Sequence, residues 1–197
     1  MHRTALLVID LQRGAFDGMR CPVIDAAGPL MDNAVALVDA ARAGGAAVVY
    51  IQHDDEPGAA FESDTVHWQL HERFAPRAGE ACIRKRESSA FEGTALHEHL
   101  QALGVTDLVT CGLQSEFCVW NTSSAGLALG YPVAVAADGH GTWPYQGRTA
   151  AEISAEINER LAAAGATVAP TATLAARLRA GSAGCDRPPG RAEAARS

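Results

Sequence analysis

A carboxylate, an ammonium and a thiol stand at places in the sequence where a parallel β-sheet would collect ligands. Asp10 and Lys85 each stand at the end of a short apolar run, and Cys118 follows a third run after a few polar residues. The carboxyl ends of parallel strands meet at one edge of a sheet, so residues far apart in sequence can converge there. A deprotonated thiol is a strong nucleophile, a carboxylate can take its proton, and a nearby ammonium stabilises the resulting anion. These residue types therefore indicate nucleophilic catalysis by Cys118.

Cys118 lies near the start of a helix-length segment that Gly130 closes. A cysteine in the first turn of a helix faces unpaired backbone N–H groups and the positive end of the helix dipole, and both favour the thiolate. The alternative is that Cys118 is a small buried hydrophobic residue, which is the more common role of a free cysteine. The segment alone leaves both interpretations open.

Asp10 and Lys85 also have ordinary structural interpretations. An acid directly after a buried strand can cap a turn. A lysine at the end of a buried strand either extends its amine into solvent or pairs with an anion, and the first is more common. The chemistry therefore depends on whether the two side chains meet.

A second polar cluster, His53-Asp54-Asp55-Glu56, stands at the exit of another apolar run. A histidine beside carboxylates suits a metal ion, but such a cluster in a turn-rich loop is more often hydrogen-bonded or solvated. We therefore predict no metal and no other cofactor.

The apolar pattern predicts strands that alternate with helices. Strand-like runs cover residues 4–9, 46–52, 81–85, the stretch ending at Gly112, 133–137 and 166–169, and helical spacing covers 29–43, 94–103, the segment closed by Gly130, about 148–164 and 171–179. Residues 59–80 and 138–144 are predicted as irregular segments. Strands joined by helices form a parallel sheet covered on both faces. We therefore predict an α/β fold with three α-β-α layers and a Rossmann-like, mostly parallel six-stranded sheet.

Length and composition indicate one domain. The 197 residues are 48% hydrophobic and 20% charged, which fits a single domain over residues 1–180. Residues 181–197 are rich in Gly, Pro, Arg and Ala without apolar periodicity, so we predict a disordered tail.

Charge and cysteine usage restrict the possible partners and compartment. A net charge of -7 without a basic stripe argues against nucleic acid. The first apolar run is too short for a signal peptide or a membrane span, so we predict a cytoplasmic protein that does not bind membranes. The five cysteines include no C-x-x-C pair, and free thiols are expected.

Three motifs in order give the chain a resemblance to a known family. They are Ala5-Leu-Leu-Val-Ile-Asp10-Leu-Gln12, then Lys85 four residues before Ser89-Ala90-Phe91, then Gly112-Leu-Gln-Ser-Glu-Phe-Cys118-Val119 followed by Thr122. With these motifs the chain, through about residue 180, resembles the isochorismatase-like cysteine hydrolase superfamily, which includes nicotinamidases and N-carbamoylsarcosine amidases.

The resemblance implies a catalytic triad of Asp10, Lys85 and Cys118. It also implies a cis peptide bond between Leu113 and Gln114, with the backbone N–H groups of Gln114 and Cys118 forming an oxyanion hole. The reaction implied is hydrolysis of an amide, carbamoyl or lactam C–N bond of a small molecule through a thioester. A homodimer or homotetramer is expected from the same resemblance.

The resemblance leaves the substrate open. The metal-binding Asp-x-His pair of nicotinamidases is not evident, because the corresponding strand exit reads Gln52-His53-Asp54. Position alone suggests four substrate-binding residues, which are Gln12, Phe16, His53 and Trp143. Two alternatives remain: an isochorismatase-type vinyl-ether hydrolase that does not need the cysteine, and a catalytically idle binding or assembly subunit.

Overall fold

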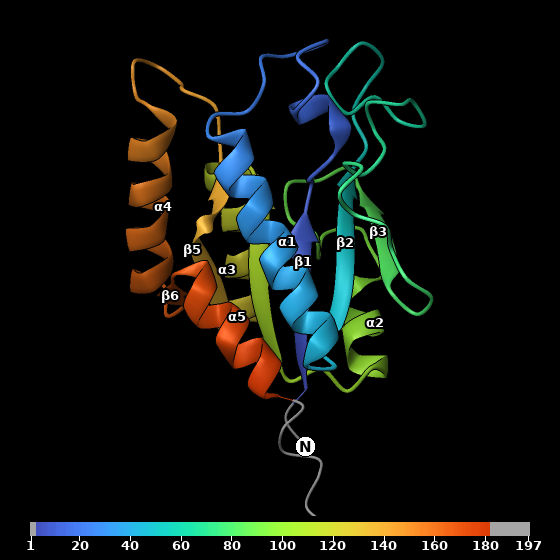
Figure 1. The fold of residues 1–197 in the computed structure, drawn as a ribbon, viewed down its shortest axis with the longest axis vertical. Coiled ribbons are helices and arrows are strands. Elements are labelled where there is room, and N and C mark those ends of the chain that lie inside the picture. Colours follow the sequence, from blue (N-terminus) through green and yellow to red (C-terminus); the bar gives the residue numbers. More distant parts are fainter. Residues whose placement is uncertain (1–2, 182–197) are drawn as a thin grey trace, which may run out of the picture.

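The computed structural model describes residues 3–181 as six strands and five helices (Figure 1). The strands are β1 (Thr4–Ile9), β2 (Ala47–His53), β3 (Ala81–Lys85), β4 (Asp107–Leu113), β5 (Val133–Gly141) and β6 (Thr167–Ala169). The helices are α1 (Ala27–Ala43), α2 (Leu96–Ala102), α3 (Trp120–Ala128), α4 (Ala150–Ala163) and α5 (Thr171–Ala180). The tail predicted over 181–197 lies outside the described residues except for Gly181.

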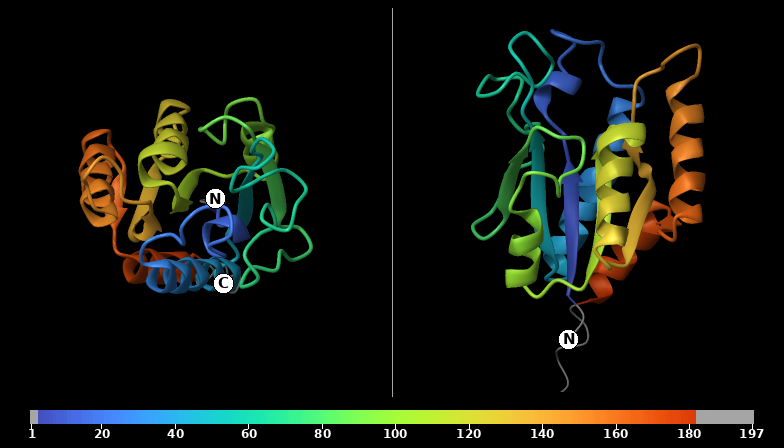
Figure 2. Two further views of the ribbon diagram at one scale, coloured as in Figure 1. Left: turned by 90° about the horizontal axis from the view of Figure 1, so that it is seen from above. Right: turned by 180° about the vertical axis from the view of Figure 1, so that it is seen from behind.

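The strands form one sheet in the order β3-β2-β1-β4-β5-β6, and each neighbouring pair is parallel. Helices α1 and α5 cover one face, and α2, α3 and α4 cover the other (Figure 2). The predicted three-layer α/β fold is confirmed, and the paired strands are all parallel rather than mostly so. None of the helices within residues 3–181 has the length and hydropathy needed to cross a lipid bilayer.

Both faces of β1 are buried, which explains its unbroken apolar sequence. Leu6 and Val8 pack into the core beneath α1, whereas Leu7 and Ile9 pack into the core on the opposite face. Side chains alternate along a strand, so a strand covered on both sides needs apolar residues at every position. The apolar run thus predicts the central place of β1 in the sheet.

The strand order reverses direction between β1 and β4. Connections from β1 lead outward through β2 to β3, and the chain then returns to place β4 on the other side of β1. In open parallel sheets ligands bind beyond the carboxyl ends of the strands at such a switch point. The fold therefore predicts a ligand site at the segments that follow β1 and β4.

The predicted glycine-rich loop over 138–144 is wrong in its first part, because β5 continues to Gly141. The pairing of β4 with β5 shifts register between Thr110 and Gly112, and Gly112 then lies opposite His140. Gly112 has a φ of 126°, and a Cβ atom there would lie 2.0 Å from the carbonyl oxygen of Ile9. Only glycine allows this close approach, and the irregular register keeps β5 paired beyond Asp138.

Candidate active site

Asp10 is the first residue after β1, at the switch point. Its backbone has a φ of 53°, a left-handed conformation that few residues other than glycine adopt. The Asp10 backbone N–H donates a 3.0 Å hydrogen bond to the carbonyl of Ile51, which extends the pairing with β2 by one residue. The carboxylate is only 2% exposed. Asp10 therefore turns inward instead of capping a solvent-exposed turn.

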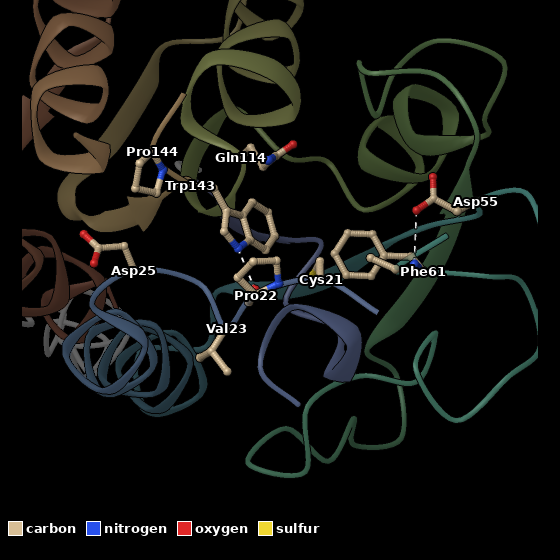
Figure 3. Close-up of a pocket in the computed structure, with 10 residues that line it drawn as sticks. Cys21, Pro22, Val23, Asp25, Asp55, Phe61, Gln114, Trp143 and Pro144 are labelled. Carbon is tan, nitrogen blue, oxygen red and sulfur yellow. Dashed lines mark hydrogen bonds between the residues drawn. The ribbon is translucent and has the colours of Figure 1, made fainter. Parts of the chain in front are cut away.

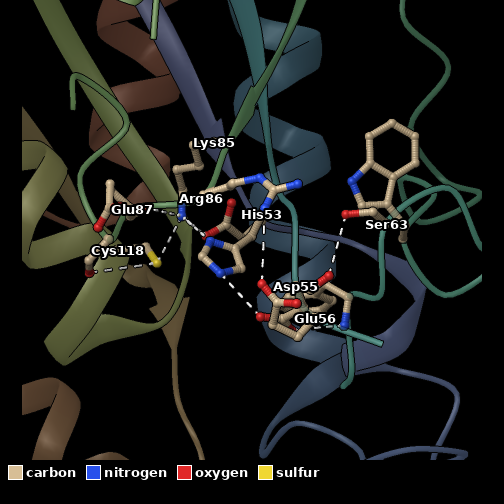
Figure 4. A network of polar contacts seen from close by, with 12 residues as sticks. His53, Asp55, Glu56, Ser63, Lys85, Arg86, Glu87 and Cys118 are labelled. Atoms are coloured by element: carbon tan, nitrogen blue, oxygen red, sulfur yellow. Dashed lines mark hydrogen bonds and ion pairs between the residues drawn. The ribbon is translucent and has the colours of Figure 1, made fainter. Parts of the chain in front are cut away.

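Lys85 ends β3 and also points inward. Its Nζ atom lies 2.9 Å from Oδ2 of Asp10 and 3.1 Å from Sγ of Cys118 (Figure 4). The same ammonium contacts Nδ1 of His53 at 2.9 Å and donates to the carbonyl of Glu87 at 3.2 Å. Burial alone would lower the pKa of Lys85, but Asp10 and Cys118 raise it above its ordinary value. The lysine therefore remains an ammonium and pairs with an anion instead of extending into solvent.

Cys118 belongs to a π-helical turn, Ser115–Val119, that directly precedes α3. This segment is called the Cys118 turn below. Burial raises the pKa of the thiol to about 12, and Asp10 acts in the same direction, whereas Lys85 opposes them. The expectation that a helix start favours a resting thiolate is therefore wrong, because desolvation and the neighbouring carboxylate outweigh the ammonium.

The carboxylate and the thiol are close enough to exchange a proton through a small movement. Ligand atoms of Asp10, His53 and Cys118 all lie within 4.8 Å of one another. Oδ2 of Asp10 is paired with Lys85, but Oδ1 is buried and has no hydrogen-bond partner within residues 3–181. An unpaired buried carboxylate oxygen is costly unless it has a functional partner. Oδ1 is thus free to accept a proton.

His53 connects the ammonium to a second carboxylate. Its Nε2 lies 3.2 Å from Oδ1 of Asp55, and its Nδ1 faces Lys85. Because the Lys85 ammonium can only donate, Nδ1 accepts and Nε2 carries the proton. The hydrogen bond from His53 is the main cause that lowers the pKa of Asp55. His53 is therefore a neutral link between Lys85 and Asp55.

The grouping of Asp10, His53 and Cys118 offers donor atoms that could hold a metal ion. The Lys85 ammonium, however, contacts all three of these residues. A metal cation at the same place would have to displace a buried positive charge. The lysine thus already supplies a positive charge to these three residues.

A cavity of about 770 Å³ lies among the segments that follow β1, β2, β4 and β5 (Figure 3). It is lined by Cys21, Pro22, Val23, Asp25, Asp55, Ala60, Phe61, Gln114, Trp143 and Pro144. Asp55 joins its wall to His53, and Gln114 joins its wall to the Cys118 turn. The cavity has room for a small molecule; Asp10, Lys85 and Cys118 are not among its lining residues, and it connects to them through Asp55 and Gln114.

The residues predicted to bind substrate occupy different places. Trp143 lines the cavity, and its indole N–H donates to the carbonyl of Pro22 at 2.7 Å (Figure 3). His53 does not line the cavity but contacts Asp55, which does. Gln12 is fully buried, and Phe16 packs against His71 and lines a separate hollow. Gln12 and Phe16 therefore do not line this cavity, and their role in substrate binding stays a prediction.

Gln12 has a structural task. Its side-chain amide donates to the carbonyls of His53 and Trp68 at 3.0 and 2.8 Å and accepts from the backbone N–H of His53 at 2.8 Å. The side chain fixes the exit of β2, where His53 must face Lys85.

The cis peptide bond implied by the resemblance is present between Leu113 and Gln114. It stands at the end of β4, immediately before the Cys118 turn. The oxyanion role of the Gln114 and Cys118 backbone N–H groups stays a prediction.

Sequence reasoning missed several residues near the thiol. Ser88 approaches Sγ of Cys118 at 3.9 Å and accepts a hydrogen bond from Asn121. Asp25 and Phe61 line the cavity from loops that carry no recognisable motif. Asp55 had a signal, because it stands two residues after a predicted site histidine among other acids.

Two known hydrolases are similar to this chain in sequence. A streptothricin hydrolase of Streptomyces noursei is 38% identical over 139 residues, which cover 71% of this chain and 50% of that protein. A ureidoacrylate amidohydrolase of Serratia proteamaculans is 26% identical over 171 residues, covering 70% of this chain and 69% of that protein. The chain thus spans about half the length of the streptothricin hydrolase that it matches.

A solved structure is also similar to this chain over most of its length. An isochorismatase from Pseudomonas putida superposes with a TM-score of 0.78 at 30% identity, covering 87% of this chain and 89% of that one. The isochorismatase domain model matches residues 4–173, which include Asp10, Lys85 and Cys118. The chain therefore belongs to the isochorismatase family of hydrolases.

Proposed function

We propose that this chain is a cysteine-dependent amidohydrolase that cleaves a C–N bond of a small molecule with Asp10, Lys85 and Cys118. The observation that carries the proposal is the position of the Lys85 ammonium, which contacts the Asp10 carboxylate and the Cys118 sulfur at once. A buried lysine that serves only the fold needs one anion to balance its charge. Contact with a carboxylate and a thiol together is typical of a site that moves a proton between them.

The first half-reaction begins with a neutral thiol, since the pKa of Cys118 is raised to about 12. As the sulfur attacks the carbonyl carbon, its proton passes to Oδ1 of Asp10, which has no other hydrogen-bond partner within residues 3–181. A tetrahedral oxyanion forms. Asp10 then gives the proton to the departing nitrogen, the C–N bond breaks, and an amine or ammonia leaves a thioester on Cys118.

The second half-reaction uses the same groups with water. Asp10 takes a proton from water as the oxygen attacks the thioester carbon. The second tetrahedral intermediate expels the sulfur, which recovers the proton from Asp10. A carboxylic or carbamic acid is released and the resting site is restored.

Lys85 has an electrostatic role in both halves. Negative charge moves from the Asp10 carboxylate to the sulfur and then to the reacting oxygen of the substrate. The Lys85 ammonium lies 2.9 Å from Oδ2 of Asp10 and 3.1 Å from Sγ of Cys118. A fixed charge in a water-poor site stabilises such a developing anion without reorganisation. The predicted oxyanion donors, the backbone N–H groups of Gln114 and Cys118, complete the proposal.

The cavity wall favours substrates that are not anionic. Asp25 and Asp55 line it, and none of its described lining residues is a lysine, arginine or histidine. The Trp143 and Phe61 rings supply apolar surface, which also suits a cationic group. A small neutral or amine-bearing amide, carbamoyl compound or lactam therefore fits better than an acid.

The test is turnover of a panel of small amides, carbamoyl compounds and lactams, followed by mass spectrometry and ammonia release. Cys118→Ala should lower turnover by about a thousandfold or more, because the nucleophile is lost. Cys82→Ala is the matched control, since Cys82 is an exposed free cysteine and its loss should leave turnover unchanged.

The alternatives give different results. Full turnover of a vinyl ether by the Cys118→Ala variant would support the ether hydrolase that does not need the cysteine. Absence of turnover on every compound, with no acyl-enzyme on Cys118, would support a binding or assembly subunit.

A further inference from the structure

A chain of buried and half-buried polar side chains connects α4 and β5 to the Cys118 turn. Oγ of Ser154 lies 2.9 Å from Oγ of Ser115, which lies 2.8 Å from Nδ1 of His140. Nε2 of His140 lies 2.9 Å from Oδ1 of Asn158, and Nδ2 of Asn158 lies 3.0 Å from the carbonyl oxygen of Ala137. Ser115 is fully buried and His140 is 6% exposed. None of these residues takes part in the proposed chemistry.

One backbone carbonyl determines the direction of every bond in this chain. The carbonyl of Ala137 can only accept, so Asn158 donates to it and presents its oxygen to His140. Nε2 of His140 must then carry the proton, which leaves Nδ1 as an acceptor for the Ser115 hydroxyl. Ser115 in turn accepts from Ser154. Burial lowers the pKa of His140, which keeps the ring neutral as this arrangement requires.

The chain ends on the first residue of the Cys118 turn. Ser115 follows Gln114 and stands three residues before Cys118. The next residue is held as well, because Oγ1 of Thr142 donates to Oε1 of Glu116 at 2.9 Å. His140 lies near the end of β5, which remains paired beyond the register shift, and Thr142 directly follows β5. The end of β5 and the residue after it thus bind two consecutive residues of the turn.

We infer that Ser115 and His140 are positioning residues that hold the Cys118 sulfur against Asp10 and Lys85. The sulfur touches Lys85 at 3.1 Å, and a shift of the turn would lengthen that contact. A displacement of about 1 Å in a catalytic group can lower the rate about a hundredfold. The effect therefore falls on the chemical step and not on substrate affinity.

The test compares Ser115→Ala with Ser123→Ala. Ser123 is also fully buried, and its hydroxyl lies 3.0 Å from Oγ1 of Thr110, away from the Cys118 turn. Ser115→Ala loses the contacts with His140 and Ser154, and Ser123→Ala loses the contact with Thr110, so the melting temperature of each variant is measured beside its kinetics. Only Ser115→Ala should lower kcat, by about tenfold to a hundredfold, with KM changed less than about twofold. Ser115→Thr keeps the hydroxyl and should recover kcat to within about threefold of the wild type.

The kinetic arm depends on the proposed function, so a second arm avoids turnover. Alkylation of Cys118 by iodoacetamide, followed by mass spectrometry, should be about tenfold slower in Ser115→Ala and in His140→Leu than in Ser123→Ala. If the wild type hydrolyses no compound, the proposed function fails while this arm still decides the inference. The inference is overturned if Ser115→Ala is alkylated as fast as Ser123→Ala or faster, or if Ser115→Thr is folded but stays as slow as Ser115→Ala.

Discussion

The Nζ atom of Lys85 lies 2.9 Å from Oδ2 of Asp10, and the two side chains are 0% and 2% exposed. The ion pair joins the ends of β3 and β1, two strands that are not neighbours because β2 lies between them. Two opposite charges buried together stabilise one another, but either one alone would be an uncompensated charge in the interior. The stability of the fold and the proposed catalysis therefore both depend on this pair.

Replacing Lys85 by Met should destabilise the fold as well as abolish activity. The buried Asp10 carboxylate would lose its counter-charge, and breaking a buried pair from one side costs about 3–5 kcal/mol. We expect the free energy of unfolding in urea to fall by this amount. The Asp10→Asn/Lys85→Met double variant should be more stable than Lys85→Met, because no unpaired charge remains. Equal stability of the two variants would contradict the pairing.

Replacing Asp10 by Asn should remove the base. The resting thiol is protonated, so its proton must pass to the carboxylate during attack. Loss of a general base lowers rates by about a hundredfold to ten-thousandfold. We expect that range for kcat, and a slower alkylation of Cys118 at neutral pH. Asp54→Asn is the control, since Asp54 pairs with Arg84 and should affect neither rate. An unchanged alkylation rate in Asp10→Asn would remove Asp10 from this role.

The raised pKa of Cys118 predicts how stability depends on pH. The folded thiol titrates at about 12 and the ordinary value is 9.0, so the folded state keeps a proton that the unfolded chain releases. This contribution is complete below pH 9.0 and is lost as the pH rises toward about 12. Each such proton steepens the fall by up to about 1.4 kcal/mol per pH unit. The unfolding free energy of Cys118→Ser should therefore fall less steeply from pH 9 upward. An unchanged slope would show that the thiol is not desolvated.

Replacing Gln12 by Ala should lower stability and leave KM unchanged. The side chain satisfies three backbone groups at the exit of β2 and has no exposed surface. Unsatisfied buried groups cost about 1–3 kcal/mol each, so we expect the melting temperature to fall clearly. Gln52→Ala should cost less, because Gln52 makes one comparable bond, to Trp68. A raised KM at wild-type stability would instead place Gln12 in the substrate pocket.

The acidic cavity wall predicts a preference among matched substrates. β-Alaninamide and succinamic acid carry opposite charges on the same ethylene spacer from the amide. We expect kcat/KM to favour the amine by about tenfold, equal to about 1.4 kcal/mol, because Asp25 and Asp55 line the cavity. Asp25→Asn and added salt should both reduce the ratio. A preference for the acid that is unchanged in Asp25→Asn would show that this cavity does not bind the substrate.

Much of the site could be predicted from the sequence because its determinants are local. An apolar run followed by a polar residue marks the end of a strand, and this pattern located Asp10 after the buried β1 and Lys85 at the end of β3, which is a partly exposed edge strand. Strands that alternate with helices require a parallel sheet, which brings those ends to one edge. The resemblance to a known family, and not a local pattern, implied the cis bond before Gln114 that the structure contains.

The other features of the site depend on tertiary packing, which no local sequence pattern shows. Whether Cys118 is ionised follows from how far burial and Asp10 outweigh Lys85, and this balance exists only when distant segments meet. Gln12 and Trp143 both follow strands, yet one is buried in backbone hydrogen bonds and the other lines the cavity. The extension of β5 past Asp138 required the register shift opposite Gly112. The sequence by itself therefore determined which groups reach the sheet edge, and the tertiary structure decided their protonation and partners, because desolvation and hydrogen bonding depend on distances between residues remote in the chain.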